Sequence, residues 1–338
     1  MTILFSTHEA FLDHVGGPRH QERPARLGAV IDGSRDAGLE LIPLEPRSAT
    51  VAELERVHVS ALVTRVREVS WAGGGHLDPD TYVSSGSWNA ALRAAGAGLS
   101  AAEALTAGHA DAAFCAVRPP GHHATRTQSM GFCLFSNVAV VAAALADRGE
   151  RVAIVDFDAH HGNGTQDVFY DDPRVLYVSL HQWPLYPGTG WFTEIGAGHA
   201  IGTTLNVPMP PGSTGDAYVA AFDRLVMPIA EKFAPSWLIV SAGFDAHRSD
   251  PITQLGLSAG DYPHMMSRLL TLAPAGRRLV MLEGGYDLDA LRACTASTLS
   301  ALVGRADSSE RATSGGPDDA FDRIAEIETF LRRAGQLS

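Results

Sequence analysis

The sequence predicts a single-domain α/β protein with a central, mostly parallel sheet of about eight strands and helices on both faces. Continuous apolar runs rich in β-branched residues, such as 152–156 and 237–241, indicate strands that are buried on both sides. Longer amphipathic segments separate these runs, and strands that alternate with helices form parallel sheets. The chain has 338 residues, 45% of them hydrophobic, which is enough for one large core.

The overall composition excludes several classes of partner. The net charge is −12 and no run is rich in Lys or Arg, so we expect no nucleic-acid partner. The first twelve residues lack the basic start and apolar core of a signal peptide, and no apolar stretch is long enough to cross a bilayer. Cys115, Cys133 and Cys294 are odd in number and irregularly spaced, which indicates reduced thiols and a cytoplasmic protein. The composition leaves the oligomeric state open.

The first third of the chain contains two predicted amphipathic segments. A helix opens at 20–26, where Pro24 suits the first turn because the first N–H groups of a helix lack partners. A second helix is expected over 51–69, ended by three glycines at 73–75. The other expected elements are a strand at 3–5, a polar loop at 8–22, a polar, exposed loop at 78–85 and an alanine-rich helix at 87–107.

The rest of the chain alternates strand and helix. Strands are expected at 112–117, 152–156, 175–181, 203–207, 237–241 and 278–282, and helices at 137–148, 215–232 and about 320–334, with a polar stretch at 307–319. Polar residues collect directly after five of these strands. The carboxyl ends of parallel strands lie on one edge of a sheet, so we expect one site built by these loops.

The most informative stretch follows the strand at 152–156. Asp156, Asp158 and His160 are spaced by two, so an extended chain points all three side chains the same way. Charges at the end of a buried strand are costly unless they are paired, and Asp and His together suit a divalent metal. The alternative is a carboxylate pair that caps the next turn, with solvated histidines. Three ligand-type side chains on one face favour the metal.

With Asp245, which follows the strand at 237–241, Asp158 and His160 form the best candidate ligand set. Three protein ligands leave a position open for water and substrate, as a catalytic zinc ion requires, and zinc lowers the pKa of its bound water to about 7. We therefore expect a zinc ion that activates water.

Two adjacent histidines, His122 and His123, follow another central strand after a Pro-Pro-Gly turn that needs neither imidazole. We expect them to act as general base and acid, with Asp156 and Asn163 as candidate partners that fix their tautomers. Tyr286 follows two glycines, and its hydroxyl suits a donor to an oxyanion. The alternatives are a solvated histidine pair and a core tyrosine.

Four motifs resemble the zinc-dependent deacetylase family, which contains histone deacetylases and acetylpolyamine amidohydrolases. They are Arg118-Pro-Pro-Gly-His-His123, Asp156-Phe-Asp-Ala-His-His-Gly-Asn-Gly-Thr-Gln166, Ser241-Ala-Gly-Phe-Asp245 and Glu283-Gly-Gly-Tyr286, in the family's order. The resemblance implies an arginase/deacetylase-type fold in one domain over 1–338, with the catalytic motifs within 1–290. It also implies a class II-like amidohydrolase that releases acetate and a free amine from acyl-lysine-type amides.

The resemblance further implies roles for individual residues. They are Asp158, His160 and Asp245 for zinc; His122, His123, Asp156, Asn163 and Tyr286 for catalysis; Gly131, Phe132 and Tyr186 for the acyl-lysine tunnel; and Arg26 for an internal exit channel. Structural potassium ions are implied at two sites, with Asp156, Asp158, His160, Ser179 and Leu180 at the first and Phe169, Asp172 and Val175 at the second. Asn163 is typical of the class II branch, since class I has an aspartate there.

Three alternatives remain. The related arginases bind two manganese ions, but the further carboxylates they need are replaced here by Gly162 and His247. A non-catalytic binding protein on this fold would be expected to have lost a catalytic residue, and none is lost. Acetylpolyamine hydrolysis is the third. The polyamine-specific branch resembles this chain but carries a glutamate at the position of Ile252, so we expect an acyl-lysine-type substrate, with Ile252 at the tunnel rim.

Overall fold

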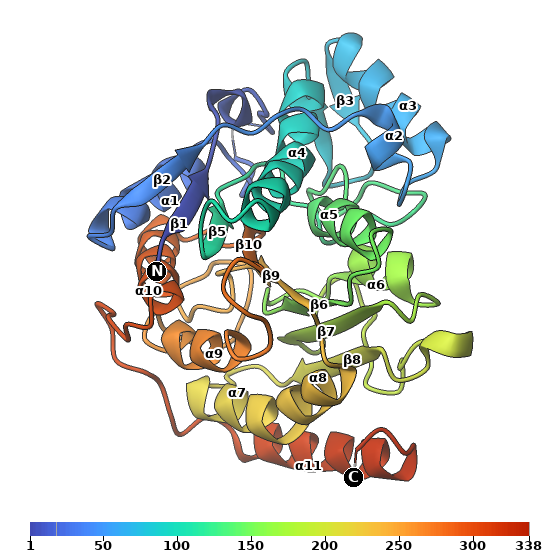
Figure 1. Ribbon diagram of the computed structural model, residues 1–338. Coiled ribbons are helices and arrows are strands. Elements are labelled where there is room, and N and C mark those ends of the chain that lie inside the picture. Colours follow the sequence, from blue (N-terminus) through green and yellow to red (C-terminus); the bar gives the residue numbers. More distant parts are fainter. Residues whose placement is uncertain (18, 338) are drawn as a thin grey trace.

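The computed structural model describes residues 1–17 and 19–337 and contains a central sheet of eight parallel strands (Figure 1). The strands are β1 (Ile3–Ser6), β2 (Leu41–Leu44), β5 (Ala112–Cys115), β6 (Val152–Asp156), β7 (Val175–Gln182), β8 (Thr204–Met209), β9 (Trp237–Ala242) and β10 (Arg278–Leu282). Their order across the sheet is β2-β1-β5-β10-β9-β6-β7-β8, and every pair is parallel. The predicted fold class is confirmed.

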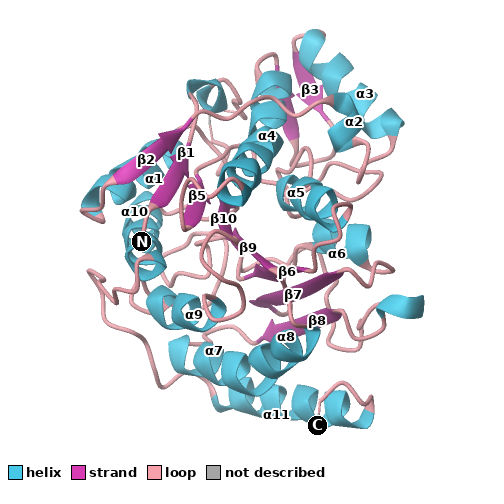
Figure 2. Cartoon of the chain, in the orientation of Figure 1, coloured by secondary structure: helices cyan, strands magenta, loops and turns pink. Residues whose placement is uncertain are grey.

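Helices cover both faces of this sheet (Figure 2). They are α1 (Ala25–Asp36), α2 (Val51–Leu54), α3 (Ser60–Trp71), α4 (Ser87–Thr106), α5 (Asn137–Ala146), α6 (Asn163–Phe169), α7 (Gly215–Ala221), α8 (Met227–Phe233), α9 (Tyr262–Leu269), α10 (Leu288–Leu302) and α11 (Asp318–Arg333). On one face α4 packs on β1, β5 and β10, α5 on β6 and β9, and α6 on β7. On the other, α1, α10, α9 and α7 contact one another in turn, and α11 closes the β8 end.

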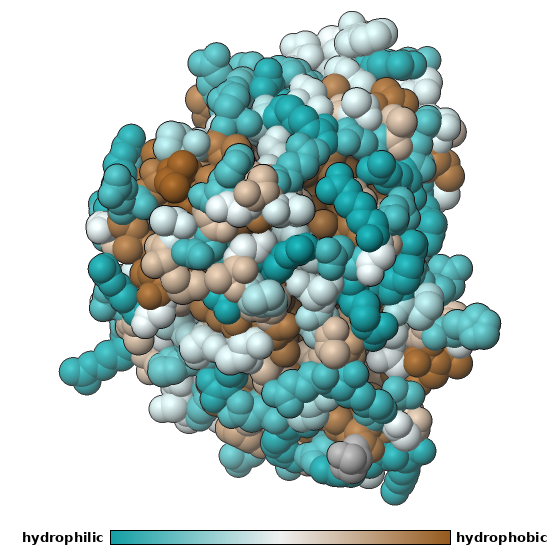
Figure 3. Space-filling model, viewed as in Figure 1, coloured by the Kyte–Doolittle hydropathy of each residue, from teal (hydrophilic) through white to brown (hydrophobic). Residues whose placement is uncertain are grey.

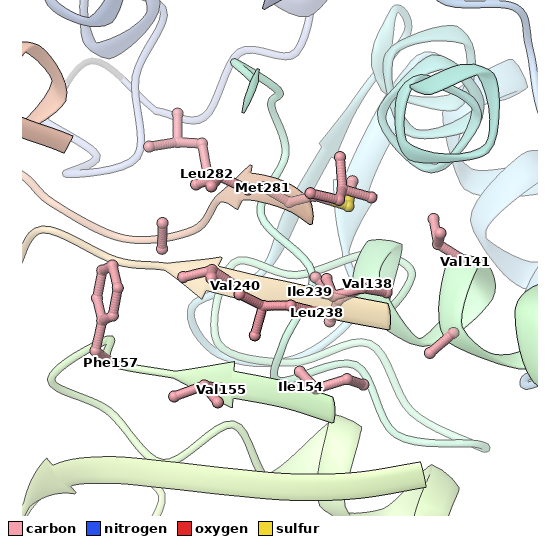
Figure 4. Packing of buried hydrophobic residues seen from close by; sticks show 14 of the residues in the cluster. Val138, Val141, Ile154, Val155, Phe157, Leu238, Ile239, Val240, Met281 and Leu282 are labelled. Atoms are coloured by element: carbon pink, nitrogen blue, oxygen red, sulfur yellow. The ribbon is translucent and has the colours of Figure 1, made fainter. Parts of the chain in front are cut away.

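The core lies where these layers meet the middle of the sheet. Every residue of β6 and β9 is buried, as the continuous apolar runs predict. Figure 4 shows Val155, Val240 and Met281 from three adjacent strands, with Val138 and Val141 of α5 beside them. Full burial of one such side chain stabilises the fold by about 1.5–3 kcal/mol. Polar residues cover most of the outer face seen in Figure 3, with small apolar groups between them.

The single helix predicted over 51–69 is wrong, because the chain turns between α2 and α3. Thr50 and Glu53 form a capping box at the start of α2, which ends at Leu54. His58 then points inward, and its Nδ1 lies 2.8 Å from the carbonyl oxygen of Thr125. Because Val57 is also buried, the apolar pattern continues through the turn and imitates an unbroken helix.

The exposed loop predicted at 78–85 is also wrong. Two short strands, β3 (Gly74–His76) and β4 (Tyr82–Ser84), pair in an antiparallel hairpin. Thr81 and Val83 are fully buried. The carboxylate of Asp78 accepts hydrogen bonds from the backbone N–H groups of Asp80 and Thr81, at 3.1 and 2.7 Å. The polar residues of this stretch therefore stabilise its turn rather than face solvent freely.

Candidate active site

Three predicted metal ligands come together at the carboxyl edge of the sheet. Nδ1 of His160 lies 3.1 Å from Oδ1 of Asp158 and 3.1 Å from Oδ2 of Asp245. All three residues are buried, and one ligand atom from each lies within 4.8 Å of the other two. Donors bound tetrahedrally to one zinc ion at about 2.0–2.1 Å lie about 3.3 Å apart, so this group fits such an ion.

The second oxygen of each carboxylate is fixed by the backbone. The N–H of Gly284 donates to Oδ2 of Asp158 at 2.8 Å, and the N–H of Ala159 donates to Oδ1 of Asp245 at 2.7 Å. A Cβ atom at Gly284 would lie 2.2 Å from Oδ2 of Asp245, so only glycine fits there. Burial lowers the pKa of His160, but hydrogen bonds to Asp158 and Asp245 outweigh it and raise the pKa to about 10. The group therefore favours a positive charge at its centre.

The tandem histidines have different partners. Nδ1 of His122 lies 3.0 Å from Oδ2 of Asp156, and Nδ1 of His123 lies 2.8 Å from Oδ1 of Asn163. Burial lowers the pKa of His122, yet the charges of Asp158 and Asp156 reverse this and raise it to about 10. Burial, with the nearby charge of His122, holds the pKa of His123 well below its usual value. The first imidazole is therefore suited to carry charge and the second to stay neutral.

The carboxylate of Glu283 holds the loop that carries these histidines. It accepts hydrogen bonds from the backbone N–H groups of Gly121 and His122, at 2.6 and 3.1 Å, and from the hydroxyl of Ser241 at 2.9 Å. Burial raises the pKa of Glu283 to about 7. Cys133, His122 and Glu283 form a second buried group of ligand-type side chains. Glu283 already accepts hydrogen bonds from two backbone groups and from Ser241. We therefore assign Glu283 a structural role and not that of a metal ligand.

A pocket of about 230 Å³ opens beside the metal-ligand group. Its lining consists of Asp80, His123, Gly131, Phe132, His160, Leu185, Tyr186, Ile252 and Tyr286. Gly131 and Phe132 both have positive φ, at 55° and 68°, and a Cβ atom at Gly131 would lie 2.4 Å from Cδ2 of His123. The ring of Tyr186 meets His123 edge-on, with centroids 5.1 Å apart. The pocket is walled by aromatic rings and lies next to the candidate metal ligands.

The family model described as the histone deacetylase domain matches residues 20–302. This chain belongs to the histone deacetylase family. It is 41% identical over 290 residues to a probable deacetylase of Archaeoglobus fulgidus, covering 83% of this chain and 80% of that one. It is 40% identical over 295 residues to a histone deacetylase-like amidohydrolase of Pseudomonas aeruginosa, covering 84% and 77%. The solved HDA15 HD domain has a TM-score of 0.92 at 34% identity, covering 99% of this chain and 98% of that one.

These similarities confirm the predicted family and enzyme class: the protein is a deacetylase, a hydrolase that acts on amides. It contains buried groups suited to a metal ion. Within the described residues, every helix is too short or too polar to cross a bilayer.

The remaining predicted residues of this deacetylase lie outside the pocket lining. The guanidinium of Arg26 lies over the ring of Tyr286, 4.9 Å from its centroid. Its Nε and Nη2 donate to the carbonyl oxygens of Gly285 and Glu283, both at 2.6 Å. Ser179 pairs with Asp156 across β7 and β6, close to the metal-ligand group, and Leu180 follows it in β7. Phe169, Asp172 and Val175 lie at the end of α6 and the start of β7, at the opposite edge of the sheet.

Two residues that line the pocket were not predicted from the sequence. These are Asp80 and Leu185, and they were not predicted because their loops show no periodic pattern. The carboxylate of Asp250 accepts hydrogen bonds from the N–H groups of Tyr286 and Ile252, at 2.8 and 3.1 Å. Burial, followed by the charge of Asp245, raises the pKa of Asp250 to about 7. These hydrogen bonds were not predicted, although Asp250 lies only two residues before Ile252, which was expected at the rim.

Proposed function

We propose that the protein is a zinc-dependent deacetylase of acyl-lysine-type amides, which releases acetate, or a longer carboxylate, and a free amine. The observation that carries this proposal is the convergence of Asp158, His160 and Asp245 beside the pocket that His123 and Tyr286 line. The zinc dependence that is general in this family supports the choice of metal. The donor set fits it too, because nitrogen and carboxylate oxygen are ordinary zinc ligands.

A zinc ion held by these ligands would supply Lewis acidity and activate water near neutral pH. His123 lines the pocket and its Nδ1 is held by the neutral amide of Asn163, so its other nitrogen can accept a proton from the attacking water. The same nitrogen then returns the proton to the leaving amine. His122, paired with the Asp156 carboxylate, keeps a positive charge near the reacting carbonyl. The Tyr286 hydroxyl donates to the carbonyl oxygen as negative charge develops there.

The pocket wall supports a slender, uncharged substrate. Acetylation removes the charge of a lysine, and the rings of Phe132 and Tyr186 offer apolar faces to its stem. A free lysine would have to lose the hydration of its ammonium there, so the product is poorly held. Ile252 adds apolar contact at the rim. The second candidate, an acetylpolyamine, is favoured by the carboxylate of Asp80 in the lining and weakly by the acidic net charge.

The family resemblance also supports structural potassium ions at the two sites named above. We further propose that the deacetylase unit takes in the whole of 1–338, because α11 packs on α7 and β8. The three unpaired cysteines support a reducing, cytoplasmic setting. The acidic net charge supports a peptide or small-molecule substrate rather than nucleic acid.

The test compares an acetyl-lysine peptide with N-acetylspermidine, using purified protein before and after chelation and after addition of zinc. We expect the peptide to be hydrolysed with the higher kcat/KM, activity to vanish on chelation, and zinc to restore it. Undiminished turnover in metal-free protein would contradict the proposed chemistry. A preference for N-acetylspermidine would instead contradict only the proposed substrate.

A further inference from the structure

One wall of the pocket belongs to a loop of residues 183–194, the wall loop. Leu185 and Tyr186 contribute its lining residues, and Tyr186 is 38% exposed. The near end of the loop is tied to the sheet, since the N–H of Trp183 donates to the carbonyl of Met209 at 2.8 Å. The position of the wall therefore also depends on what holds the far end.

The far end is held by the carboxylate of Glu194. Oε1 accepts hydrogen bonds from the backbone N–H groups of Gly190 and Trp191, at 3.2 and 3.0 Å. Oε2 lies 2.6 Å from Nε2 of Gln166, in α6. Glu194 thus closes its own loop and joins it to the helix that also carries Asn163, the partner of His123.

The donor and acceptor roles in this chain of contacts are fixed by the carboxylate, which can only accept. Gln166 must therefore point its NH₂ group at Glu194 and its oxygen toward Nδ2 of Asn206, at 2.7 Å, and Nε2 of His161, at 3.0 Å. His161 then carries its proton on Nε2, and its Nδ1 accepts from the hydroxyl of Thr189 at 2.8 Å. Each of these contacts pairs a donor with an acceptor.

The backbone of the wall loop also lies directly against two histidine rings. Gly190 has a φ of 90°, and a Cβ atom there would lie 2.6 Å from Cγ of His161 and 2.7 Å from Nε2 of His181. Nε2 of His181 lies 3.0 Å from the carbonyl oxygen of Gly190 and donates to it. Gly190 therefore packs closely against His161, the residue that follows the candidate ligand His160.

We propose that Gln166 and Glu194 are positioning residues that fix the wall loop and thereby set the affinity for a slender acyl amide. Neither residue lines the pocket, so they act through Leu185 and Tyr186. The inference rests on the proposed function for its substrate. The hydrogen-bond chain itself does not depend on that function.

The test reverses the pair. Gln166→Glu alone sets two carboxylates against each other, whereas adding Glu194→Gln restores an amide opposite a carboxylate and leaves an acceptor toward His161 and Asn206. For the acetyl-lysine peptide we expect Gln166→Glu to raise KM about tenfold with kcat changed less than about threefold, because a misplaced contact group costs mainly binding. The double variant should recover to within about threefold of wild type.

Loop position has its own measurement, which a merely structural role elsewhere would not change. Trp183 and Trp191 lie in the wall loop with ring centroids 5.2 Å apart, so acrylamide quenching of tryptophan emission should rise in Gln166→Glu and return in the double variant. Asp223→Asn, which alters an exposed ion pair with Arg268, is the matched control and should leave both measurements unchanged.

Failure of this inference differs from failure of the proposed function. If the wild type does not hydrolyse the peptide, the function is wrong, and quenching alone still decides the role of the pair. Unchanged KM and quenching in Gln166→Glu, or a double variant no better than the single one, would overturn the inference. If Gln166→Glu does not fold, Glu194→Ala removes only the loop end of the hydrogen-bond chain. The inference then requires the same rise in KM and in quenching for Glu194→Ala.

Discussion

The metal-ligand group and the pocket wall adjoin each other but are built in different ways. Asp158 and Asp245 follow two buried neighbouring strands, whose ends are aligned through the pairing of Asp156 with Ser241. Tyr186 and Asp80 lie on loops that are fixed by contacts with distant parts of the chain. We therefore expect the sheet to position the groups that carry the chemistry, and the loops around it to determine substrate selectivity. Changes at strand ends should lower the rate of reaction, whereas changes at the wall should alter which substrate is bound.

The largest effect in this comparison is expected at the tandem histidines. His123→Ala should lower kcat by about 10²–10⁴, the usual loss for a general acid–base group, while the zinc content stays unchanged. His122→Ala is the matched control and should lose less, because its ring is absent from the pocket lining. Steady-state kinetics with metal analysis decides between them. If kcat falls strongly in His122→Ala but is nearly normal in His123→Ala, the two roles are reversed.

The next largest effect is expected for Tyr286→Phe. This change should lower kcat by about 10²–10³, which corresponds to roughly 3–4 kcal/mol of activation free energy. The change removes one hydroxyl and keeps the ring, which packs against Phe132 with centroids 5.8 Å apart. KM should therefore change far less than kcat. An unchanged kcat in Tyr286→Phe would make this residue part of the wall only.

His58 holds the loop that follows the tandem histidines. The pH dependence of the free energy of unfolding measures its contribution. Its Nδ1 donates to the carbonyl of Thr125 and its Nε2 accepts from the N–H of Ser136, at 2.8 and 2.9 Å. Burial, with a smaller effect of Arg126, lowers the pKa of His58 from 6.5 to about 4. The unfolded chain therefore takes up this proton first as the pH falls. The contribution of neutral His58 to the free energy of unfolding is complete above pH 6.5 and is lost between pH 6.5 and about 4.

The full contribution of His58 to the free energy of unfolding is about 3 kcal/mol. Between about pH 7.5 and about pH 5, roughly 2 kcal/mol of the wild-type loss in unfolding free energy should come from His58. Urea denaturation of His58→Gln should show a loss smaller by that amount. Equal pH dependence in the two proteins would mean that His58 does not titrate on unfolding as described.

The convergence of Asp158, His160 and Asp245 could be expected from the sequence for a physical reason. A parallel strand buried on both faces leaves a continuous apolar run, and the first charged residues after it lie at a known edge of the sheet. The spacing of Asp156, Asp158 and His160 was therefore informative without any knowledge of the loops. The same reasoning located β9 and β10, and with them Asp245 and Tyr286.

Several other elements were not predicted, some of them because they lack such a pattern. Strand β2 lies at the sheet edge with partly exposed residues and contains Pro43, and β3 contains two glycines. Helices α6, α9 and α10 were not predicted. Of these, α6 has only seven residues and follows directly on the histidine motif. Asp80 and Leu185 line the pocket from loops, and loop positions leave no local period in the sequence.

The smallest effect concerns the rim. Ile252→Glu places a carboxylate where the chain now offers apolar contact, and it should shift selectivity toward N-acetylspermidine by about 1 kcal/mol, the worth of a partly exposed ion pair. The measurement is the ratio of kcat/KM for N-acetylspermidine and an acetyl-lysine peptide in both proteins. Leu185 and Tyr186 face the same pocket, so an unchanged ratio would assign selectivity to the wall loop instead of residue 252.

The central claim is that one metal ion, held by Asp158, His160 and Asp245, is required for amide hydrolysis. Its most direct test is a titration of metal-free wild type and Asp245→Ala with zinc, followed by turnover and bound metal together. Wild-type activity should rise in proportion to bound zinc and level off at one ion per chain, while Asp245→Ala should bind little zinc and lose about 10³-fold or more in rate. Activity that needs two ions per chain, or that is retained in Asp245→Ala without bound metal, would contradict the account.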